Sequence, residues 1–184
     1  MNDVAAHIAS FLVHTLCTLY IAALMLRVLL ALVRADFYNP FSQFLVTITN
    51  PVVVPLRRVV PSVGGADSAS IILIVGLKIL ELLLLVMIAG AAPSFPALIV
   101  VAILQLAELL IYIFIFALIV QAVISWIAPA QVYENPVVSI LDDLTQPLLQ
   151  PVRRVLPPVG MVDLSPLAVI IGLYVLLIIL RSLY

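Results

Sequence analysis

Two sets of polar side chains in this 184-residue chain could carry chemistry, and the first is a pair of adjacent arginines that occurs twice. The two pairs are Arg57-Arg58 and Arg153-Arg154. Guanidinium groups form paired hydrogen bonds with phosphate and carboxylate, so each pair could bind anionic lipid headgroups or an acidic protein. Alternatively, the arginines serve only as interfacial anchors that set the topology of a membrane protein.

The second set lies inside long apolar runs and consists of His14, Lys78, Glu81, Gln105 and Glu108. Lys78 and Glu81 are spaced so that they share one face of a helix and can pair. A charge at mid-bilayer is costly unless it is paired, neutralised or hydrated, which makes these residues candidates for function. Two interpretations remain open: a neutral packed cluster in which protonated Glu108 bonds to Gln105, or a cation or proton pathway. We interpret His14 as a hydrogen-bonding packing residue, because no second ligand stands at metal-binding spacing.

Composition indicates the class of protein that must position these residues. Hydrophobic residues make up 66% of the chain and charged residues 9%, against roughly half and a quarter in globular proteins. A soluble domain of this size cannot bury so much apolar surface, whereas a bilayer can. The long apolar runs do not alternate with polar residues, so helices are expected and not a barrel. The sequence predicts an all-α membrane protein with four transmembrane helices, at about residues 8–33, 69–92, 97–128 and 166–183.

The arginines also predict an orientation. Both long connections lie on one side of the membrane, because an even number of spans separates them, and they hold Arg34 and both arginine pairs. The positive-inside rule places these connections in the cytoplasm. We therefore expect a multi-pass protein of the bacterial inner membrane, with the N- and C-termini in the periplasm. The net charge of −1 argues against nucleic-acid binding.

The chain contains an internal repeat with an offset of 96 residues. Thirteen of the 29 positions from 39 to 67 are identical to their counterparts between 135 and 163, without a gap. We predict two helical-hairpin repeats of parallel topology, residues 1–92 and 97–184, related by a pseudo-two-fold axis along the membrane normal. Besides the arginines, the shared motif consists of Asn39, Pro40, Pro55, Pro61, Gly64 and Asp67, matched by Asn135, Pro136, Pro151, Pro157, Gly160 and Asp163.

Each connection has a predicted structure of its own. Apolar residues at helical spacing, such as Phe41, Phe44 and Leu45, predict a short amphipathic helix in the membrane interface. The prolines that flank each arginine pair should confine any helix there to about one turn. Asp67 and Asp163 are placed to cap the next spans. Within those spans, Gly76 and Gly172 are expected to allow close helix approach.

The repeat bears on the transport interpretation. Lys78, Glu81 and Glu108 are replaced at the equivalent positions by Tyr174, Leu177 and Leu12. A transport site shared by both halves would be expected to use both copies, so these differences count against a symmetric pathway. Four helices also make a thin wall for a pore, so a channel would require a homo-oligomer.

These motifs resemble those of the YggT (YlmG) family of bacterial and chloroplast membrane proteins. The resemblance rests on Asp-Phe-Tyr-Asn-Pro-Phe at residues 36–41, the doubled Pro-x-Arg-Arg-x-x-Pro and the Val-Gly-x-x-Asp after each copy, and it covers nearly the whole chain. The resemblance implies the hairpin fold, and the family has no established enzymatic activity or cofactor. It also implies associations with cell division and membrane organisation, chloroplast nucleoid distribution, haem attachment, and osmotic stress with potassium handling.

Together these observations predict a non-catalytic membrane-organising or assembly factor without a cofactor or metal. Its expected partners are the bilayer, including anionic lipids, and an unidentified membrane protein. The alternative is an ion channel or transporter component in osmotic-stress or potassium homeostasis, centred on Lys78, Glu81 and Glu108. The first function should depend on the arginine pairs and tolerate Glu108→Gln, and the second should show the reverse.

Overall fold

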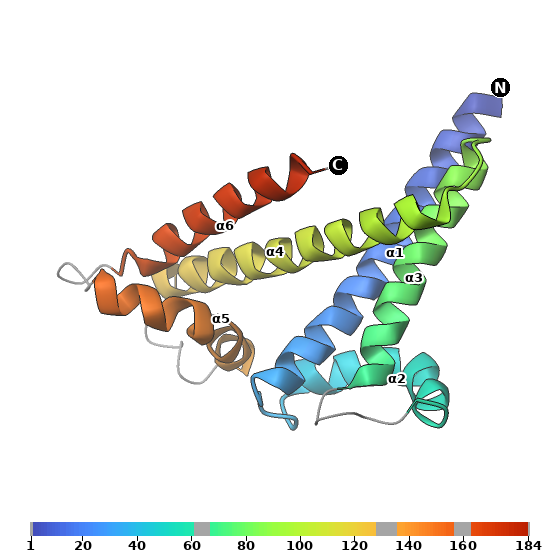
Figure 1. Ribbon diagram of the computed structural model, residues 1–184. Helices are drawn as coiled ribbons and strands as arrows, with labels where there is room; N and C mark the ends of the chain where they lie inside the picture. The colour runs from blue at the N-terminus through green and yellow to red at the C-terminus, as the bar shows by residue number, and fades with distance from the viewer. Residues whose placement is uncertain (1, 61–66, 128–135, 157–162, 184) are drawn as a thin grey trace. The chain divides into compact units, whose positions relative to one another are not determined.

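The computed structural model describes residues 2–60, 67–127, 136–156 and 163–183. All regular secondary structure in this part of the chain is helical, which confirms the predicted all-α class (Figure 1). The six helices are α1 (Asn2–Leu32), α2 (Pro40–Arg57), α3 (Ser68–Ile88), α4 (Phe95–Ile127), α5 (Pro136–Val155) and α6 (Ser165–Arg181). Pro61, Gly64, Asn135, Pro157 and Gly160 of the repeated motif lie outside the described residues.

Three of the described helices are long and apolar enough to cross a membrane: Val4–Leu32 in α1, Ser68–Ile88 in α3 and Phe95–Ile124 in α4. The chain is therefore an all-α membrane protein. The apolar helix α6 has 17 residues, slightly fewer than the roughly 20 that a straight span needs. Its role as a fourth span stays a prediction.

The ends of two long helices show why they stop where they do. After α3, Gly90 takes a left-handed conformation with a φ of 69°, and the Ala91 amide donates back to the Val86 carbonyl. After α1, Arg34 adopts the same conformation with a φ of 56°, at a cost of about 1–2 kcal/mol for a residue with a side chain. Both turns bind carbonyls that a helix end would otherwise leave without a donor.

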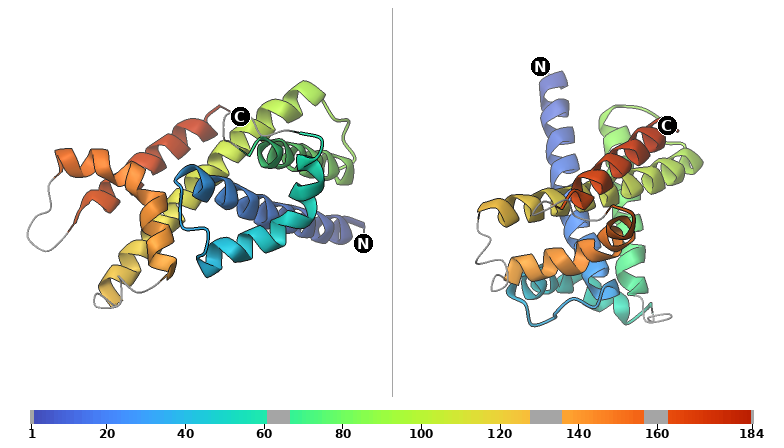
Figure 2. Two further views of the ribbon diagram at one scale, coloured as in Figure 1. Left: turned by 90° about the horizontal axis from the view of Figure 1, so that it is seen from below. Right: turned by 90° about the vertical axis from the view of Figure 1, so that its left-hand side faces the viewer.

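The proline-rich connections differ from the prediction. Pro51 and Pro55 lie inside α2, and Pro147 and Pro151 lie inside α5. Arg57 therefore ends α2 with Arg58 just past it, and Arg153 and Arg154 lie in the last turn of α5, so neither pair stands in a separate one-turn piece. Both helices change direction along their length (Figure 2), as expected where proline lacks the amide donor and its ring crowds the preceding turn.

The chain divides into two compact units. The first contains residues 1–28 and 45–109, and Ile21 and Leu24 of α1 pack there on Ile74 of α3. The second contains residues 29–44 and 110–184, and its core joins α4, α5 and α6 through Leu118, Leu149 and Val169. These units do not coincide with the sequence repeats, whose boundaries stay a prediction.

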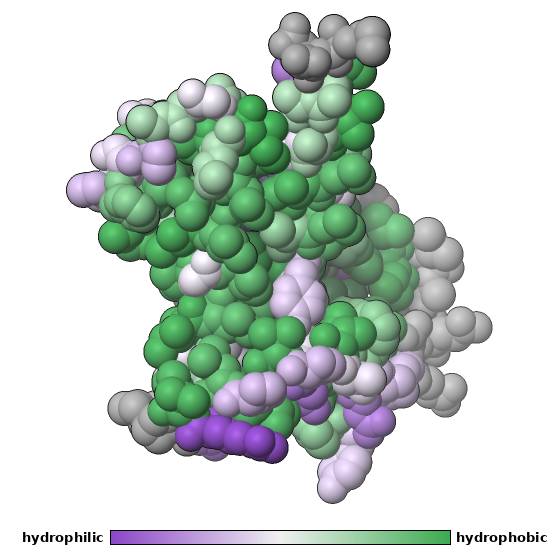
Figure 3. Space-filling model, turned by 90° about the vertical axis from the view of Figure 1, so that its right-hand side faces the viewer, coloured by the Kyte–Doolittle hydropathy of each residue, from purple (hydrophilic) through white to green (hydrophobic). Residues whose placement is uncertain are grey.

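The outer surface of the long helices is apolar, as a lipid environment requires. On the face that Figure 3 shows, hydrophobic residues dominate and hydrophilic residues gather at the end where α2 lies. One expectation about helix packing is wrong. Gly76 and Gly172 are exposed, and among the described residues no atom lies within 4 Å of a Cβ added at either glycine. Neither glycine therefore permits a close approach within this chain.

Candidate functional site

The most deeply buried charges are Lys78 and Glu81, near the middle of α3, with exposed fractions of 4% and 0%. The Lys78 ammonium donates to both carboxylate oxygens of Glu81, at 3.0 and 3.1 Å. The pairing predicted from their spacing is therefore present. It places both charges within one helix, where each compensates the other away from water.

A third member of this cluster comes from another helix. His14 Nδ1 on α1 lies 2.7 Å from Glu81 Oε1, so Glu81 bonds to His14 as well as to Lys78. The side chain of His14 is 57% exposed. The sequence did not indicate this contact, because only the packing of α1 on α3 brings residues 67 positions apart together. Gln105 and Glu108 lie on α4 in the same unit, both half-buried, and their predicted bond to each other stays a prediction.

An apolar layer separates this cluster from the polar groups nearer the start of α3. Ile21 and Leu24 lie between His14 and Arg27 along α1, and Ile74 lies between Ser70 and Lys78 along α3. These three side chains are buried and pack in one cluster. Within the described residues of this unit, the α1–α3 interface therefore contains two polar regions separated by a mainly apolar layer, against which Tyr20 packs with a buried hydroxyl.

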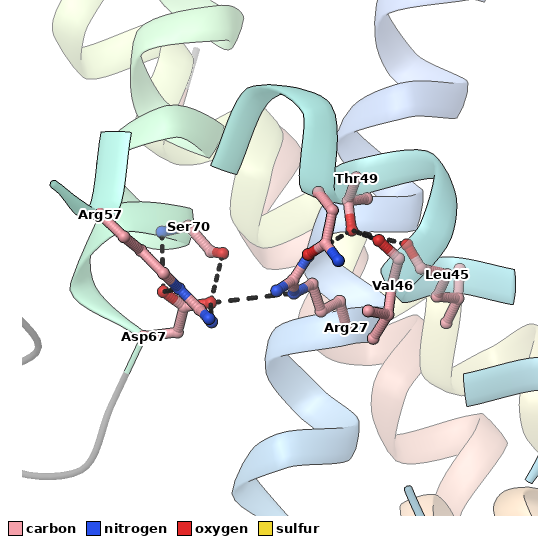
Figure 4. A network of polar contacts seen from close by, with 8 residues as sticks. Arg27, Leu45, Val46, Thr49, Arg57, Asp67 and Ser70 are labelled. Atoms are coloured by element: carbon pink, nitrogen blue, oxygen red, sulfur yellow. Dashed lines mark hydrogen bonds and ion pairs between the residues drawn. The ribbon is translucent and has the colours of Figure 1, made fainter. Parts of the chain in front are cut away.

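The second polar region centres on Arg27 of α1 (Figure 4). Its guanidinium donates to Thr49 Oγ1 at 2.6 Å and to Asn50 Oδ1 at 2.9 Å, both on α2. Its Nε lies 3.8 Å from Asp67 Oδ2, at the start of α3. Arg27 therefore connects three helices. His14 precedes Arg27 along α1, whereas Glu81, the partner of His14, comes after Asp67, the partner of Arg27. The helices α1 and α3 are therefore antiparallel. Thr49 and Asn50 were not among the predicted site residues.

Arg57 binds the same carboxylate from the end of α2. Its Nη2 lies 2.5 Å from Asp67 Oδ2 and its Nε 3.2 Å from Asp67 Oδ1, a bidentate ion pair. Asp67 also accepts the Ser70 amide, which confirms its predicted capping role. Burial acts to raise the pKa of Asp67, but hydrogen bonds from Arg57 and Ser70 outweigh it and lower the pKa below its usual value. The hydrogen bond to Asp67 raises the pKa of Arg57.

The second unit contains the equivalent ion pair. Arg153 Nη2 lies 2.8 Å from Asp163 Oδ2, and Asp163 accepts the Ser165 amide at 2.9 Å. Burial acts to raise the pKa of Asp163, but the hydrogen bonds from Ser165 and Arg153 lower it overall. We call the contacts Arg57–Asp67 and Arg153–Asp163 the two clamps. Each ties the end of a proline-containing helix to the start of the next apolar helix.

A polar contact also attaches α5 to the preceding long helix. Thr145, which is fully buried, donates to Gln121 Oε1 of α4 at 2.8 Å, and the Gln121 amide donates to Asp142. Thr145 is the repeat counterpart of Thr49, yet Gln121 is not the counterpart of Arg27. The two copies therefore attach equivalent threonines with different residues, which the alignment of the repeats could not reveal.

Asn39 has a structural role that fits its place in the motif. It is buried, its side chain accepts the Phe41 amide, and its Nδ2 donates to the Pro136 carbonyl at 2.6 Å. It therefore joins the first turns of α2 and α5, which begin at Pro40 and Pro136.

On α5, burial together with the charges of Asp142 and Asp36 raises the pKa of Asp143.

The second arginine of each pair is placed differently from the first. Arg58 and Arg154 are exposed, and the side chain of neither makes a hydrogen bond or ion pair with any described residue. The two arginines of each pair were expected to have the same role. In the structure, the first arginine of each pair binds an aspartate and the second is exposed.

Among the described residues, no group of three or more His, Cys, Asp or Glu side chains could hold a metal ion.

The clamps predict a pH-dependent difference between neighbouring arginines. Arg57→Gln should lower the free energy of unfolding by about 1 kcal/mol, because the ion pair is partly exposed, whereas Arg58→Gln should change it by less than about 0.5 kcal/mol. The pKa of Asp67 is lower in the folded state, so the clamp stabilises fully above the unfolded pKa of about 4 and weakens as the pH falls through the folded value. Thermal unfolding of the purified protein from pH 7 to pH 3 checks this. A constant deficit of Arg57→Gln at all pH values would contradict it.

Comparisons with known proteins give a consistent result. The sequence model of the CCB3/YggT family matches residues 6–88 and 100–184. A Vibrio alginolyticus protein described as uncharacterized, from the proC 3' region, is 40% identical over 166 residues, covering 89% of this chain and 88% of that protein. The uncharacterized protein PA0392 of Pseudomonas aeruginosa is 38% identical over 167 residues, covering 90% and 84%. Escherichia coli (strain K12) YggT is 36% identical over 167 residues, covering 91% and 86%. No solved structure matches the chain.

Proposed function

The chain belongs to the CCB3/YggT family, and from that premise we propose that it is a non-catalytic membrane protein that organises or assembles other membrane components. We place it in the bacterial inner membrane, with α2 and α5 at the cytoplasmic surface. Its partners would be the lipids around these helices, anionic lipids included, and an unidentified membrane protein.

The repeated clamp is the observation that carries this proposal. In each unit the last turn of a proline-containing amphipathic helix carries an arginine that binds the aspartate before the next apolar helix. The threonine of each helix is buried against the preceding long helix. This double attachment supports a fixed platform that presents the next arginine outward, as a docking surface requires. An enzyme would instead need a concave site with convergent reactive groups.

The apolar layer argues against the transport alternative. A cation or proton that reached Glu81 would meet Ile21, Leu24 and Ile74 before it reached Arg27 and Asp67. Glu81 is also fully engaged with Lys78 and His14. A compensated charge cluster bounded on one side by a mainly apolar layer supports a packing role better than a pathway.

Flux into liposomes tests the proposal against that alternative. Liposomes with the purified protein should take up potassium and protons no faster than empty liposomes, and Glu108→Gln or Lys78→Met should change nothing. Protease protection should confirm insertion, and valinomycin should confirm that the assay detects flux. In cells that lack the protein, expression of the Glu108→Gln variant should complement the loss. Expression of the variant in which all four paired arginines are replaced should not complement it. Flux that both membrane variants abolish would replace this proposal with transport.

A further inference from the structure

We propose that Arg58 and Arg154 each bind the phosphate group of an anionic phospholipid in the surrounding bilayer, whereas Arg57 and Arg153 hold the chain in the conformation that presents them. This inference rests on the proposed function, because it names the ligand of the same outward surface. It divides each arginine pair into a clamp residue and a lipid-binding residue.

Charge compensation is the first step of the argument. The charges of Arg57 and Arg153 are met by Asp67 and Asp163 at 2.5 and 2.8 Å. Arg58 and Arg154 have no such acid among the described residues. At the end of its proline-containing helix, each unit therefore presents an exposed guanidinium whose charge the described chain does not compensate, and an anion is the ligand that completes it.

The position of these arginines is the second step. Asp67 directly precedes α3, an apolar helix long enough to cross the membrane. Because the clamp holds Arg57 against Asp67, its neighbour Arg58 must lie close to the level at which the hydrocarbon ends. Phosphate groups of the bilayer lie at that level. In the second unit, Asp163 stands in the same relation to the apolar helix α6.

The residue that follows each outward arginine favours a lipid over a dissolved anion. Val59 and Val155 are both 79% exposed, the same value in two separate units. An exposed valine gains nothing from water, but it can enter the boundary between headgroups and acyl chains beside an arginine that stays at the phosphate. Free phosphate would use the arginine and leave the valine without a role. The pattern therefore fits a ligand with an anionic head and an apolar body.

Lipid selectivity measured on the full-length protein tests this assignment. The protein is reconstituted in phosphatidylcholine vesicles, and the fraction of motionally restricted spin-labelled phosphatidylglycerol is compared with that of spin-labelled phosphatidylcholine. We expect a preference for phosphatidylglycerol of about fivefold at each arginine site, the equivalent of about 1 kcal/mol for one arginine at the surface. Arg58→Gln with Arg154→Gln should remove the preference.

The matched control changes the neighbouring arginines. Arg57→Lys with Arg153→Lys retains the ion pairs that hold Arg58 and Arg154 in place, so this double variant should keep the preference, whereas Arg57→Gln with Arg153→Gln should weaken it because it releases both clamps. Inorganic phosphate should lower the preference no more than chloride does at equal ionic strength. At a site built for free phosphate, inorganic phosphate would instead displace the lipid more strongly than chloride.

The outcomes separate this inference from the proposed function. A loss in Arg57→Lys with Arg153→Lys as large as that in Arg58→Gln with Arg154→Gln would overturn the division of roles. An unchanged preference without Arg58 and Arg154 would overturn lipid binding, and recovery of a protein partner that depends on them would then leave the assembly role standing. Potassium or proton flux in the same vesicles would overturn the proposed function without affecting lipid selectivity.

Discussion

Glu81→Gln is expected to destabilise the protein by on the order of 3–5 kcal/mol, the usual cost of leaving one member of a buried ion pair without its partner. Lys78 would remain buried near the middle of α3, 4% exposed, with no carboxylate to accept its hydrogen bonds. His14 would also lose its charged partner on α3. Thermal unfolding in detergent, followed by size-exclusion chromatography, should show a large fall in the midpoint temperature or failure to recover folded protein.

The second repeat provides the control for this variant. Leu177 occupies the position equivalent to Glu81, and it is buried in a cluster with Ile111 and Ile115. An apolar residue therefore packs at this position when no lysine needs a partner. Glu81→Leu combined with Lys78→Met should recover most of the lost stability, since both charges are removed together. A double variant as unstable as Glu81→Gln would show that the pair has a role other than mutual compensation.

Arg27→Met is expected to have the second largest effect, a loss of roughly 2–4 kcal/mol, because it leaves several buried polar groups without a donor. Thr49 is fully buried and Asn50 half-buried on α2, and both accept from the guanidinium of Arg27. Asp67 would keep only the Arg57 clamp as its cationic partner. The midpoint of thermal unfolding should fall, and proteolysis at α2 should become faster as this helix detaches from α1.

Arg34→Gln is the matched control for Arg27→Met. Arg34 stands seven residues further along the chain, is exposed and makes no side-chain bond with any described residue. Its replacement should leave the unfolding midpoint within about one degree, as for most surface substitutions. If both variants lower the midpoint equally, general loss of positive charge and not the bonds of Arg27 would explain the effect.

The sequence was sufficient for the features that depend on local chemistry. Apolar run lengths located α1, α3 and α4 to within a few residues, except that α1 begins several residues earlier than expected. Spacing predicted the Lys78–Glu81 pair, and position predicted the Asp67 cap. All three depend on residues near one another in the chain, for which helical geometry determines the contact.

The missed features depend on tertiary packing. The His14–Glu81 bond joins residues on different helices, and so does the attachment of Thr49 to Arg27. Sequence spacing does not reveal which faces of two apolar helices meet, because lipid-facing and protein-facing surfaces have the same composition. The continuity of α2 through Pro55 was missed for another reason. A proline weakens a helix locally, but packing of neighbouring residues such as Val53 can outweigh that loss.

The prolines inside α2 and α5 also determine how each helix is rotated about its own axis. A proline supplies no amide, so the carbonyl four residues earlier loses its usual helical donor. In α2 this applies to the carbonyl of Pro51, and in α5 to those of Asp143 and Pro147. Such acceptors avoid hydrocarbon, since an unsatisfied carbonyl costs several kcal/mol there. Each helix therefore carries a stripe of carbonyl acceptors that needs the aqueous phase or other polar groups beside it. Rolling either helix to bring another side toward the lipid would dehydrate that stripe, so the rotation of the outward arginine is set by backbone hydration as well as by side-chain contacts.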